Sequence, residues 1–151
     1  MVMWEWRDDG KTHINIYSCG QTDLGRALSN FSPIPEGGEI ETPDGPFHTI
    51  EGYYFWLGTG DPRFRTCEGS RAKALSKLLP QTQHVSDFKE RVAQALQAKL
   101  DASPSIQQML RECTLPLTHY YVMKGRVVAG AAPWILAWWN GARRKLQNDI
   151  S

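Results

Sequence analysis

The amino-acid sequence predicts an α+β fold that is mainly helical, in a single compact domain over residues 1–151 with a few short strands and hairpins. Apolar residues recur every three to four positions in several segments, which is typical of amphipathic helices. Short runs of β-branched and aromatic residues are bounded by Gly, Pro and Asp, which predicts short strands joined by turns. A chain of 151 residues fits one domain and buries enough surface for one core.

In the first half of the chain, alternation of apolar and polar residues predicts one strand, and a Pro-Asp-Gly turn predicts two further extended pieces. Pro33 disfavours a helical backbone at Ser32, so a turn of helix is expected to run into a rigid polar loop there. In chain order, we predict a strand at 14–18, a helical turn and loop at 24–35, two extended pieces joined at 43–45, and a buried aromatic helix from 49 that stops at 58–62.

The second half of the chain is predicted to be mostly helical. Phe88, Val92, Leu96 and Leu100 recur every four residues, which predicts an amphipathic helix with Ser86 as its N-cap. In chain order, we predict helices at 69–79, at 86–100 and from Pro104, a hairpin around Lys124-Gly125, and a final helix from Pro133 that ends in basic residues.

Composition narrows the class of protein. A net charge of +1 gives no chain-wide basic surface, so any nucleic-acid contact is expected to be local. The three cysteines, Cys19, Cys67 and Cys113, are widely spaced and odd in number, which favours a reducing compartment. The N-terminal stretch MVMWEWRDDG does not resemble a signal peptide, and no run reaches the ~20 apolar residues that a membrane span needs. We therefore expect a cytoplasmic protein with no membrane partner.

Glu51 is the strongest candidate for chemistry. It stands among aromatic and aliphatic residues, at the expected start of the aromatic helix. One interpretation is a carboxylate that faces water at the positive end of the helix. The other is a carboxylate in an aromatic cleft, with a pKa raised by desolvation so that it exchanges a proton near neutral pH.

The loop at 24–35 carries groups that suit a nucleotide. The Asn30 amide can bind ribose hydroxyls or phosphate, and the Arg26 guanidinium can bind an anion through two hydrogen bonds. Ser29 and Asn30 can equally serve as helix caps. Lys73, on the next predicted helix, offers either a phosphate contact or a solvated charge.

Aromatic and histidine residues give weaker indications. Tyr53, Tyr54 and Trp56 cannot all face inward from one helix, so one of them is expected to line the cleft. The four histidines share no metal-ligand spacing, and His119 opens the predicted hairpin, where a single histidine is usually structural. The signatures of dinucleotide-binding, P-loop and α/β-hydrolase sites are also missing. We expect neither a metal nor a cofactor.

Four stretches carry a family resemblance: YS at 17–18, LG with LSNFSP within 24–33, FHTIEGYY at 47–54, and AK at 72–73. They resemble the motif series of the NADAR (YbiA-like) family, in which an LSNF loop precedes an aromatic-x-T-x-E-x-Y-[YF] helix start and a later helix of small and basic residues. The resemblance covers about half of the chain. It implies a compact, mainly helical α+β domain.

The resemblance also implies an activity, which is hydrolysis of N-glycosidic bonds in phosphorylated riboflavin-pathway intermediates or in ADP-ribose attached to guanine bases. Glu51 matches the catalytic glutamate of the family. The expected partner is therefore a small nucleotide or an ADP-ribosylated base. The candidate ligand-binding residues, from the resemblance and from the residue types together, are Gly25, Arg26, Ser29, Asn30, Phe31, Tyr54, Lys73 and His119.

The chain departs from the family pattern at three places. Gly58 stands where the family has a lysine, and Phe88 stands where it has a tryptophan. The C-terminal E…D..WG block is replaced by LTHYYVMKGRVV, with His119 near the position of the first acid. The chain then either uses His119, Tyr121 or Lys124 instead, or has lost turnover. These departures favour a divergent branch of the family, of a phage type.

Two other functions stay open at this stage. A non-catalytic binder of ADP-ribose-like or NAD-derived nucleotides would keep the loop and Glu51 without the second catalytic group. An interaction module would present tryptophans of the last helix to a partner. On that helix, the spacing predicts that Trp134 and Trp138 face the core and that Trp139 lies off this face.

Overall fold

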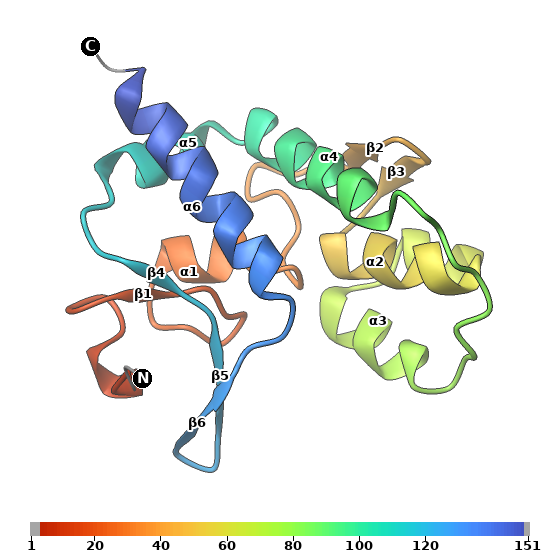
Figure 1. Cartoon of the computed structure of the whole chain (residues 1–151), viewed down its shortest axis with the longest axis horizontal. Coiled ribbons are helices and arrows are strands. Elements are labelled where there is room, and N and C mark those ends of the chain that lie inside the picture. The colour runs from red at the N-terminus through yellow and green to blue at the C-terminus, as the bar shows by residue number, and fades with distance from the viewer. Residues whose placement is uncertain (1–3, 150–151) are drawn as a thin grey trace. The chain divides into compact units, whose positions relative to one another are not determined.

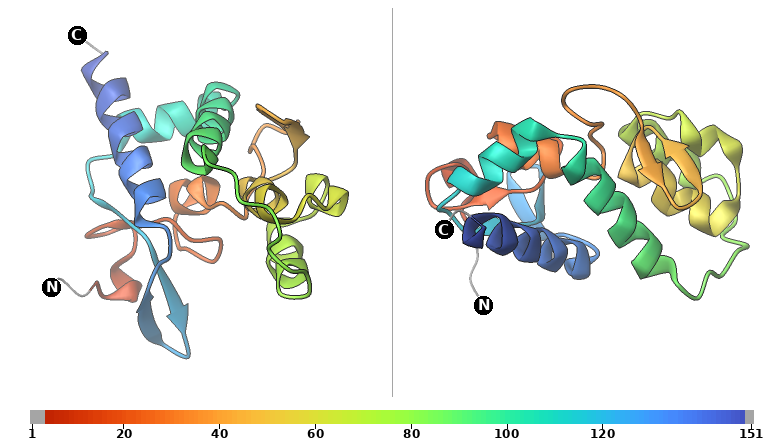
Figure 2. Two further views of the ribbon diagram at one scale, coloured as in Figure 1. Left: turned by 45° about the vertical axis from the view of Figure 1, so that its right-hand side comes forward. Right: turned by 90° about the horizontal axis from the view of Figure 1, so that it is seen from above.

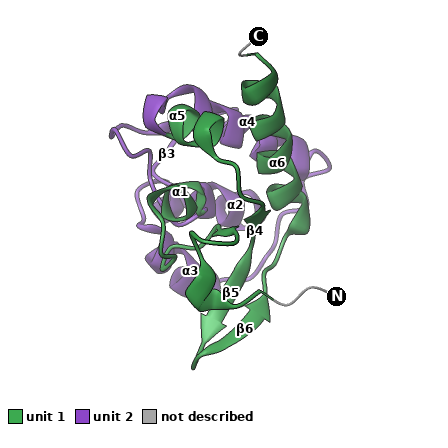
Figure 3. Ribbon diagram, turned by 90° about the vertical axis from the view of Figure 1, so that its left-hand side faces the viewer, with its two compact units in different colours: residues 1–29, 106–151 green, residues 30–105 purple. Residues whose placement is uncertain are grey.

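The computed structural model describes residues 4–149, so the first three residues of the N-terminal stretch interpreted above lie outside it. Helices outweigh strands, and the α+β class predicted from the sequence is confirmed (Figure 1). The chain forms two compact units (Figure 3), of which unit 1 comprises residues 1–29 and 106–151 and unit 2 comprises residues 30–105. The loop predicted at 24–35 begins in unit 1 and ends in unit 2.

Unit 2 contains a β-hairpin and three helices. Strand β2 (Ile40–Thr42) pairs antiparallel with β3 (Gly45–Phe47) across the predicted turn. Helices α2 (Ile50–Thr59), α3 (Gly69–Ser76) and α4 (Phe88–Asp101) follow, with a short 3-10 helix η2 (Pro62–Arg65) between α2 and α3. Helix α4 packs on β2 and α2, and α3 packs on α2. The core of the unit includes Ile40, Phe47, Ile50, Tyr53, Leu57, Phe64, Val92 and Leu96.

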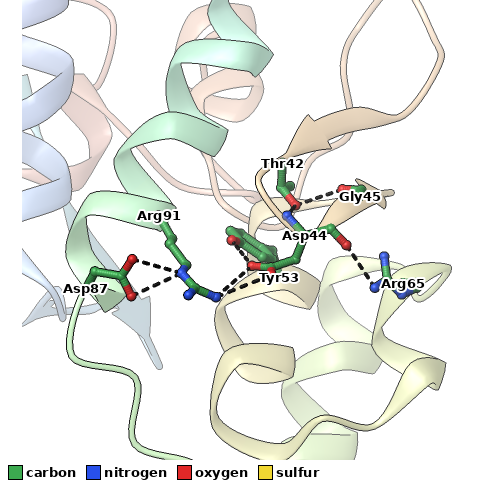
Figure 4. Close-up of polar contacts among 7 residues, drawn as sticks. All are labelled: Thr42, Asp44, Gly45, Tyr53, Arg65, Asp87 and Arg91. Carbon is green, nitrogen blue, oxygen red and sulfur yellow. Dashed lines mark hydrogen bonds and ion pairs between the residues drawn. The ribbon is translucent and has the colours of Figure 1, made fainter.

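A polar network ties the hairpin of unit 2 to its helices (Figure 4). The Tyr53 hydroxyl donates to Oδ2 of Asp44 over 2.6 Å, and the Arg91 guanidinium on α4 donates to the same carboxylate at 3.2 Å. Arg91 also pairs with Asp87 one turn earlier, at 3.0 Å. The Arg65 guanidinium donates to the backbone carbonyl of Asp44 at 2.9 Å. The Asp44 turn is therefore fixed from three sides.

Unit 1 is built from both ends of the chain. After a 3-10 helix η1 (Trp6–Asp8), strand β1 (Ile14–Asn15) pairs in parallel with β4 (Leu117–Thr118), and α1 (Asp23–Leu28) follows β1. Strands β5 (Tyr120–Met123) and β6 (Arg126–Ala129) form the predicted hairpin, and Figure 2 shows it extending as a two-stranded ribbon. The last helix is α6 (Pro133–Asn148), and α5 (Pro104–Glu112) runs from the end of unit 2 into unit 1.

Two predictions about the helices are wrong. Ser86 does not cap α4, because the helix begins at Phe88 and the carboxylate of Asp87, in the N-cap position, pairs with Arg91 instead of a backbone amide. On α6, Trp139 is fully buried and lies on the same buried face as Ile135 and Ala142, whereas Trp134 and Trp138 are half-buried. Spacing alone does not distinguish these two neighbouring faces of the helix, since both carry large apolar residues.

The remaining elements agree with the sequence, and two of them are shorter than predicted. The strand predicted at 14–18 is restricted to Ile14–Asn15, and the helix predicted at 69–79 ends at Ser76. Within residues 4–149, no helix has the length and apolar character that crossing a membrane requires.

Candidate active site

Glu51 lies in the first turn of α2, where the side chain of Thr49 caps the helix by accepting from the backbone N–H of Gly52 at 3.1 Å. Although this position favours a carboxylate that points to water, Glu51 is buried, with 8% of its surface exposed. The neighbours on α2, Ile50 and Tyr53, are fully buried. The desolvated carboxyl group predicted from the aromatic surroundings is therefore present.

The burial of Glu51 changes its proton affinity. Removal from water disfavours the ionised form and raises the pKa of the carboxyl group to about 7, while the charge of Lys73 acts in the opposite direction. Lys73 is exposed on α3, the helix that packs on α2. A carboxyl group with a pKa about 7 can both accept and return a proton at neutral pH.

The loop that follows residue 29 is joined to the start of α2. The backbone carbonyl of Asn30 accepts a hydrogen bond from the backbone N–H of Glu51, at 2.9 Å. Phe31 packs against Gly69 at the start of α3 so closely that a Cβ on Gly69 would overlap the backbone of Phe31. The structure thus places Asn30 and Phe31 beside the starts of α2 and α3, the helices that carry Glu51 and Lys73.

The two tyrosines after Glu51 have different surroundings. Tyr53 is in the core, with its hydroxyl bound to Asp44, and both burial and this acceptor raise its pKa. Tyr54 is half-buried, and its ring meets the Phe88 ring edge-on, with 4.8 Å between the centroids. Tyr54 is therefore the more exposed ring of this pair. It follows Glu51 by three residues, nearly one turn of the helix.

The other candidate residues belong to unit 1 and have structural contacts there. The Arg26 guanidinium donates to the carbonyl of Gly20 at 2.8 Å and pairs with Asp23 at 2.5 Å. Ser29 is the C-cap of α1 and is buried. The carbonyl of Gly25 accepts from the Tyr17 N–H at 3.1 Å.

His119 also has a structural contact in unit 1. Its Nδ1 lies 2.7 Å from the carbonyl oxygen of Ile16, so the neutral ring carries its proton on Nδ1 and donates to Ile16. The ring also meets Tyr121, with 5.3 Å between centroids. The ligand roles of His119, Gly25, Arg26 and Ser29 stay predictions from the sequence.

Gly58 stands where the NADAR-type pattern has a lysine. It is buried on α2, and a Cβ at this position would meet the side-chain amide of Gln81. Gln81 therefore occupies the space that a longer side chain at position 58 would need. At this position, where the family pattern has a lysine, the Gln81 side chain packs against the glycine instead.

Lys99 is the residue of this region that the sequence reasoning missed. It is fully buried on α4, and its Nζ donates to the backbone carbonyl of Ser32 at 2.9 Å. The signal was present in the sequence, because Lys99 follows Ala95 by four residues and Leu96 by three on the apolar stripe of the helix. A lysine in such a stripe requires either an exposed position or a buried partner.

Comparison with known proteins places the fold. One solved structure, the NMR structure of the E. coli protein YbiA, is similar over 98% of this chain and 89% of that chain, with a TM-score of 0.63 and 17% sequence identity. This chain has a YbiA-like fold. No protein-family model matches the sequence. No curated protein matches it either.

The candidate site combines an acidic group, Glu51, with a basic group, Lys73. Among residues 4–149, no three His, Cys, Asp or Glu side chains lie together in a way that could hold a metal ion. The groups that this part of the structure offers for chemistry are the Glu51 carboxyl group, the Lys73 charge and the polar backbone of the loop.

The pKa of Glu51 predicts how stability responds to pH. Between pH 4.5 and about 7 the folded protein holds a proton that the unfolded chain releases, so the free energy of unfolding falls as pH rises through this window. Glu51→Gln removes this loss and should make the protein more stable than the wild type by up to about 3 kcal/mol at pH 8, at about 1.4 kcal/mol per pH unit. Urea unfolding of both proteins from pH 4.5 to pH 8 measures the difference.

The matched control for this measurement is Glu41→Gln, because Glu41 is exposed on β2. We expect no comparable gain in that variant. A difference between wild type and Glu51→Gln that stays constant over the pH range would contradict a raised pKa at Glu51.

The contact between Gly69 and Phe31 gives a second prediction. In Gly69→Ala the new methyl group overlaps backbone atoms of Phe31, which cannot turn away as a side chain can. We expect a loss of about 1–3 kcal/mol in the free energy of unfolding. Gly58→Ala is the control, because the flexible end of Gln81 can move and an alanine inside a helix gains up to about 1 kcal/mol over glycine. Equal stability of the two variants in urea would contradict the close packing of α3 on the loop.

Proposed function

We propose that this protein is an N-glycosidase that hydrolyses the bond between a base and ribose, or between a base and ADP-ribose, with Glu51 as the catalytic carboxylate. The observation that supports it most is the buried Glu51, with its pKa about 7, joined through its own amide to the Asn30 carbonyl of the polar loop. The YbiA-like fold and the LSNF-type loop support the same class of reaction.

In the proposed reaction, water attacks the anomeric carbon as the bond from this carbon to the base nitrogen breaks. The bonding electron pair leaves with the base, and positive charge develops on the ribose ring. Ionised Glu51 stabilises this charge or accepts a proton from the attacking water. The proton then passes to the departing base, which restores the carboxylate.

The other residues of unit 2 have roles in binding. The Asn30 amide binds ribose hydroxyls, and Phe31 offers an apolar wall beside the sugar. Lys73, whose charge acts to lower the pKa of Glu51, binds the phosphate of a nucleotide substrate. The half-buried Tyr54 stacks on the base. The prolines at 33 and 35 keep the loop rigid, so less entropy is lost on binding.

A second function is favoured by one observation. Residues 113–148 carry neither Asp nor Glu, so this part of the chain offers no acid to assist Glu51. Glycoside hydrolysis generally uses a pair of carboxyl groups. The alternative is therefore a non-catalytic binder that holds ADP-ribose-like or NAD-derived nucleotides without cleaving them.

One experiment separates the two functions. The purified protein is incubated with an ADP-ribosylated guanine oligonucleotide and, separately, with an aminopyrimidine ribose phosphate, and released base is measured by chromatography. Calorimetric titration with ADP-ribose is run in parallel. Release of free base supports the N-glycosidase, and stoichiometric binding without release supports the binder. If the protein neither releases base nor binds ADP-ribose, both functions are contradicted.

A further inference from the structure

Three consecutive residues of the loop are held by three different helices of unit 2. The Asn30 carbonyl accepts from the amide of Glu51 on α2, and Phe31 packs on Gly69 at the start of α3. The Ser32 carbonyl accepts from Nζ of Lys99 on α4, at 2.9 Å. The backbone of this short segment is therefore held by contacts from α2, α3 and α4.

The exit of the loop is also held. The Glu36 carboxylate accepts from the Ser103 hydroxyl at 2.6 Å and from the Ser105 backbone N–H at 2.8 Å. These bonds favour its ionised form and lower the pKa of Glu36. Between these two anchors, Pro33 and Pro35 have no backbone N–H to donate and their rings restrict the backbone.

Burying the Lys99 amine costs free energy of desolvation. Val92, Ala95 and Leu96 on the same helix are fully buried, and an apolar residue at position 99 would continue their stripe without desolvating an amine. Full burial lowers the pKa of Lys99 to about 7, which reflects the cost of keeping its charge away from water. A stabilising role alone does not account for a lysine here, since buried charged groups are often no better than apolar ones for stability.

We propose that Lys99 is a positioning residue for the Glu51 site: it holds the Ser32 carbonyl, fixes the backbone of residues 30–32, and thereby fixes the amide and carboxylate of Glu51. Lys99 is connected to Glu51 through the loop backbone, by the hydrogen bond from Nζ to the Ser32 carbonyl and the hydrogen bond from the Glu51 amide to the Asn30 carbonyl. The catalytic consequence rests on the proposed function, but the positioning itself does not.

The test compares Lys99→Met, which has similar length and no donor, with wild type and with Lys99→Arg, which keeps donors. Amide hydrogen exchange by NMR is followed at Glu51 and at Leu96 in the middle of α4. In Lys99→Met we expect exchange at Glu51 to become faster by about tenfold or more relative to Leu96, because the loop opens locally. We expect the pKa of the Glu51 carboxyl group, measured by carbon-13 NMR, to fall from about 7 toward 4.5 as water enters. Lys99→Arg should restore protection at Glu51 at least in part.

Lys89→Met, at an exposed position of the same helix, is the matched control and should leave both readouts unchanged. If Lys99→Met does not fold, Lys99→Gln replaces it, because the shorter amide cannot reach as far as the amine. A variant that loses overall stability but keeps wild-type exchange at Glu51 and its raised pKa would overturn the proposal.

Different measurements test the positioning role of Lys99 and the proposed N-glycosidase activity. The exchange and pKa measurements need no substrate, so absence of base release by the wild type would count against the N-glycosidase alone. If the wild type does release base, Lys99→Met should lower kcat/KM by about tenfold or more, and Lys99→Arg should recover part of the loss.

Discussion

Glu51→Gln protein is expected to lose turnover by about 10²–10⁴-fold, the usual contribution of a general acid–base group. Glutamine has nearly the same shape, but it can neither carry the negative charge that stabilises a developing oxocarbenium ion nor accept a proton from water. The amide hydrogen bond to the Asn30 carbonyl is retained, because it is made by the backbone of residue 51. The measurement is kcat/KM for whichever nucleotide substrate releases base in the wild type.

The pH profile is part of the same expected result. Because the ionised form is the active one, wild-type activity should rise through pH about 7, where Glu51 loses its proton, and then level off. Glu41→Gln, the exposed control, should keep both the rate and the profile. Since Glu51→Gln should also be the more stable protein at pH 8, loss of activity there cannot be attributed to unfolding. Unchanged turnover in Glu51→Gln would remove Glu51 from the catalytic role.

Trp139→Ala is expected to lower the free energy of unfolding by about 3–5 kcal/mol, the range for removing a fully buried large aromatic side chain. Trp139 is one of the largest fully buried side chains in residues 4–149, and it packs edge-on against Trp138, with 5.0 Å between ring centroids. Its removal leaves a cavity in unit 1 that the surrounding backbone cannot fill. Urea unfolding measures the change.

Two further substitutions serve as controls for Trp139. Trp138→Ala, at the adjacent half-buried position, should cost clearly less. Trp139→Phe should also cost less than Trp139→Ala, because both variants remove an indole N–H that is buried without a hydrogen-bond partner but the phenyl ring leaves a smaller cavity. Comparable losses in Trp138→Ala and Trp139→Ala would contradict the assignment of Trp139 to the core.

Much of the fold was predictable because it depends on local patterns. The turn at 43–45, the hairpin around Lys124-Gly125 and the helix from Pro133 all appear in the structure. Each is specified by residues within a few positions of one another, through turn chemistry or helix initiation. The prediction that Ser86 caps α4 also used a local pattern, and it was wrong. Asp87 holds the N-cap position instead, and its carboxylate pairs with Arg91 one turn along the helix.

The candidate site was predictable in part, for a related reason. A carboxylate among aromatic residues predicts desolvation, and Glu51 is buried with a raised pKa. Which side chains meet it was not predictable in the same way. The packing of Phe31 on Gly69 and the bond from Lys99 to Ser32 join residues 38 and 67 positions apart, and no local pattern specifies such pairs.

The sequence by itself determined where the helices, turns and the acidic candidate lie, since apolar period, proline and glycine act over a few residues. Tertiary structure alone decided which face of α6 is buried, which helix supplies a donor to the loop, and what fills the space beside Gly58. The physical reason is that the spacing of apolar residues defines an apolar face of a helix but not the element that packs against it. The effect of a buried amine or of a glycine without a Cβ depends on the atoms that pack against it.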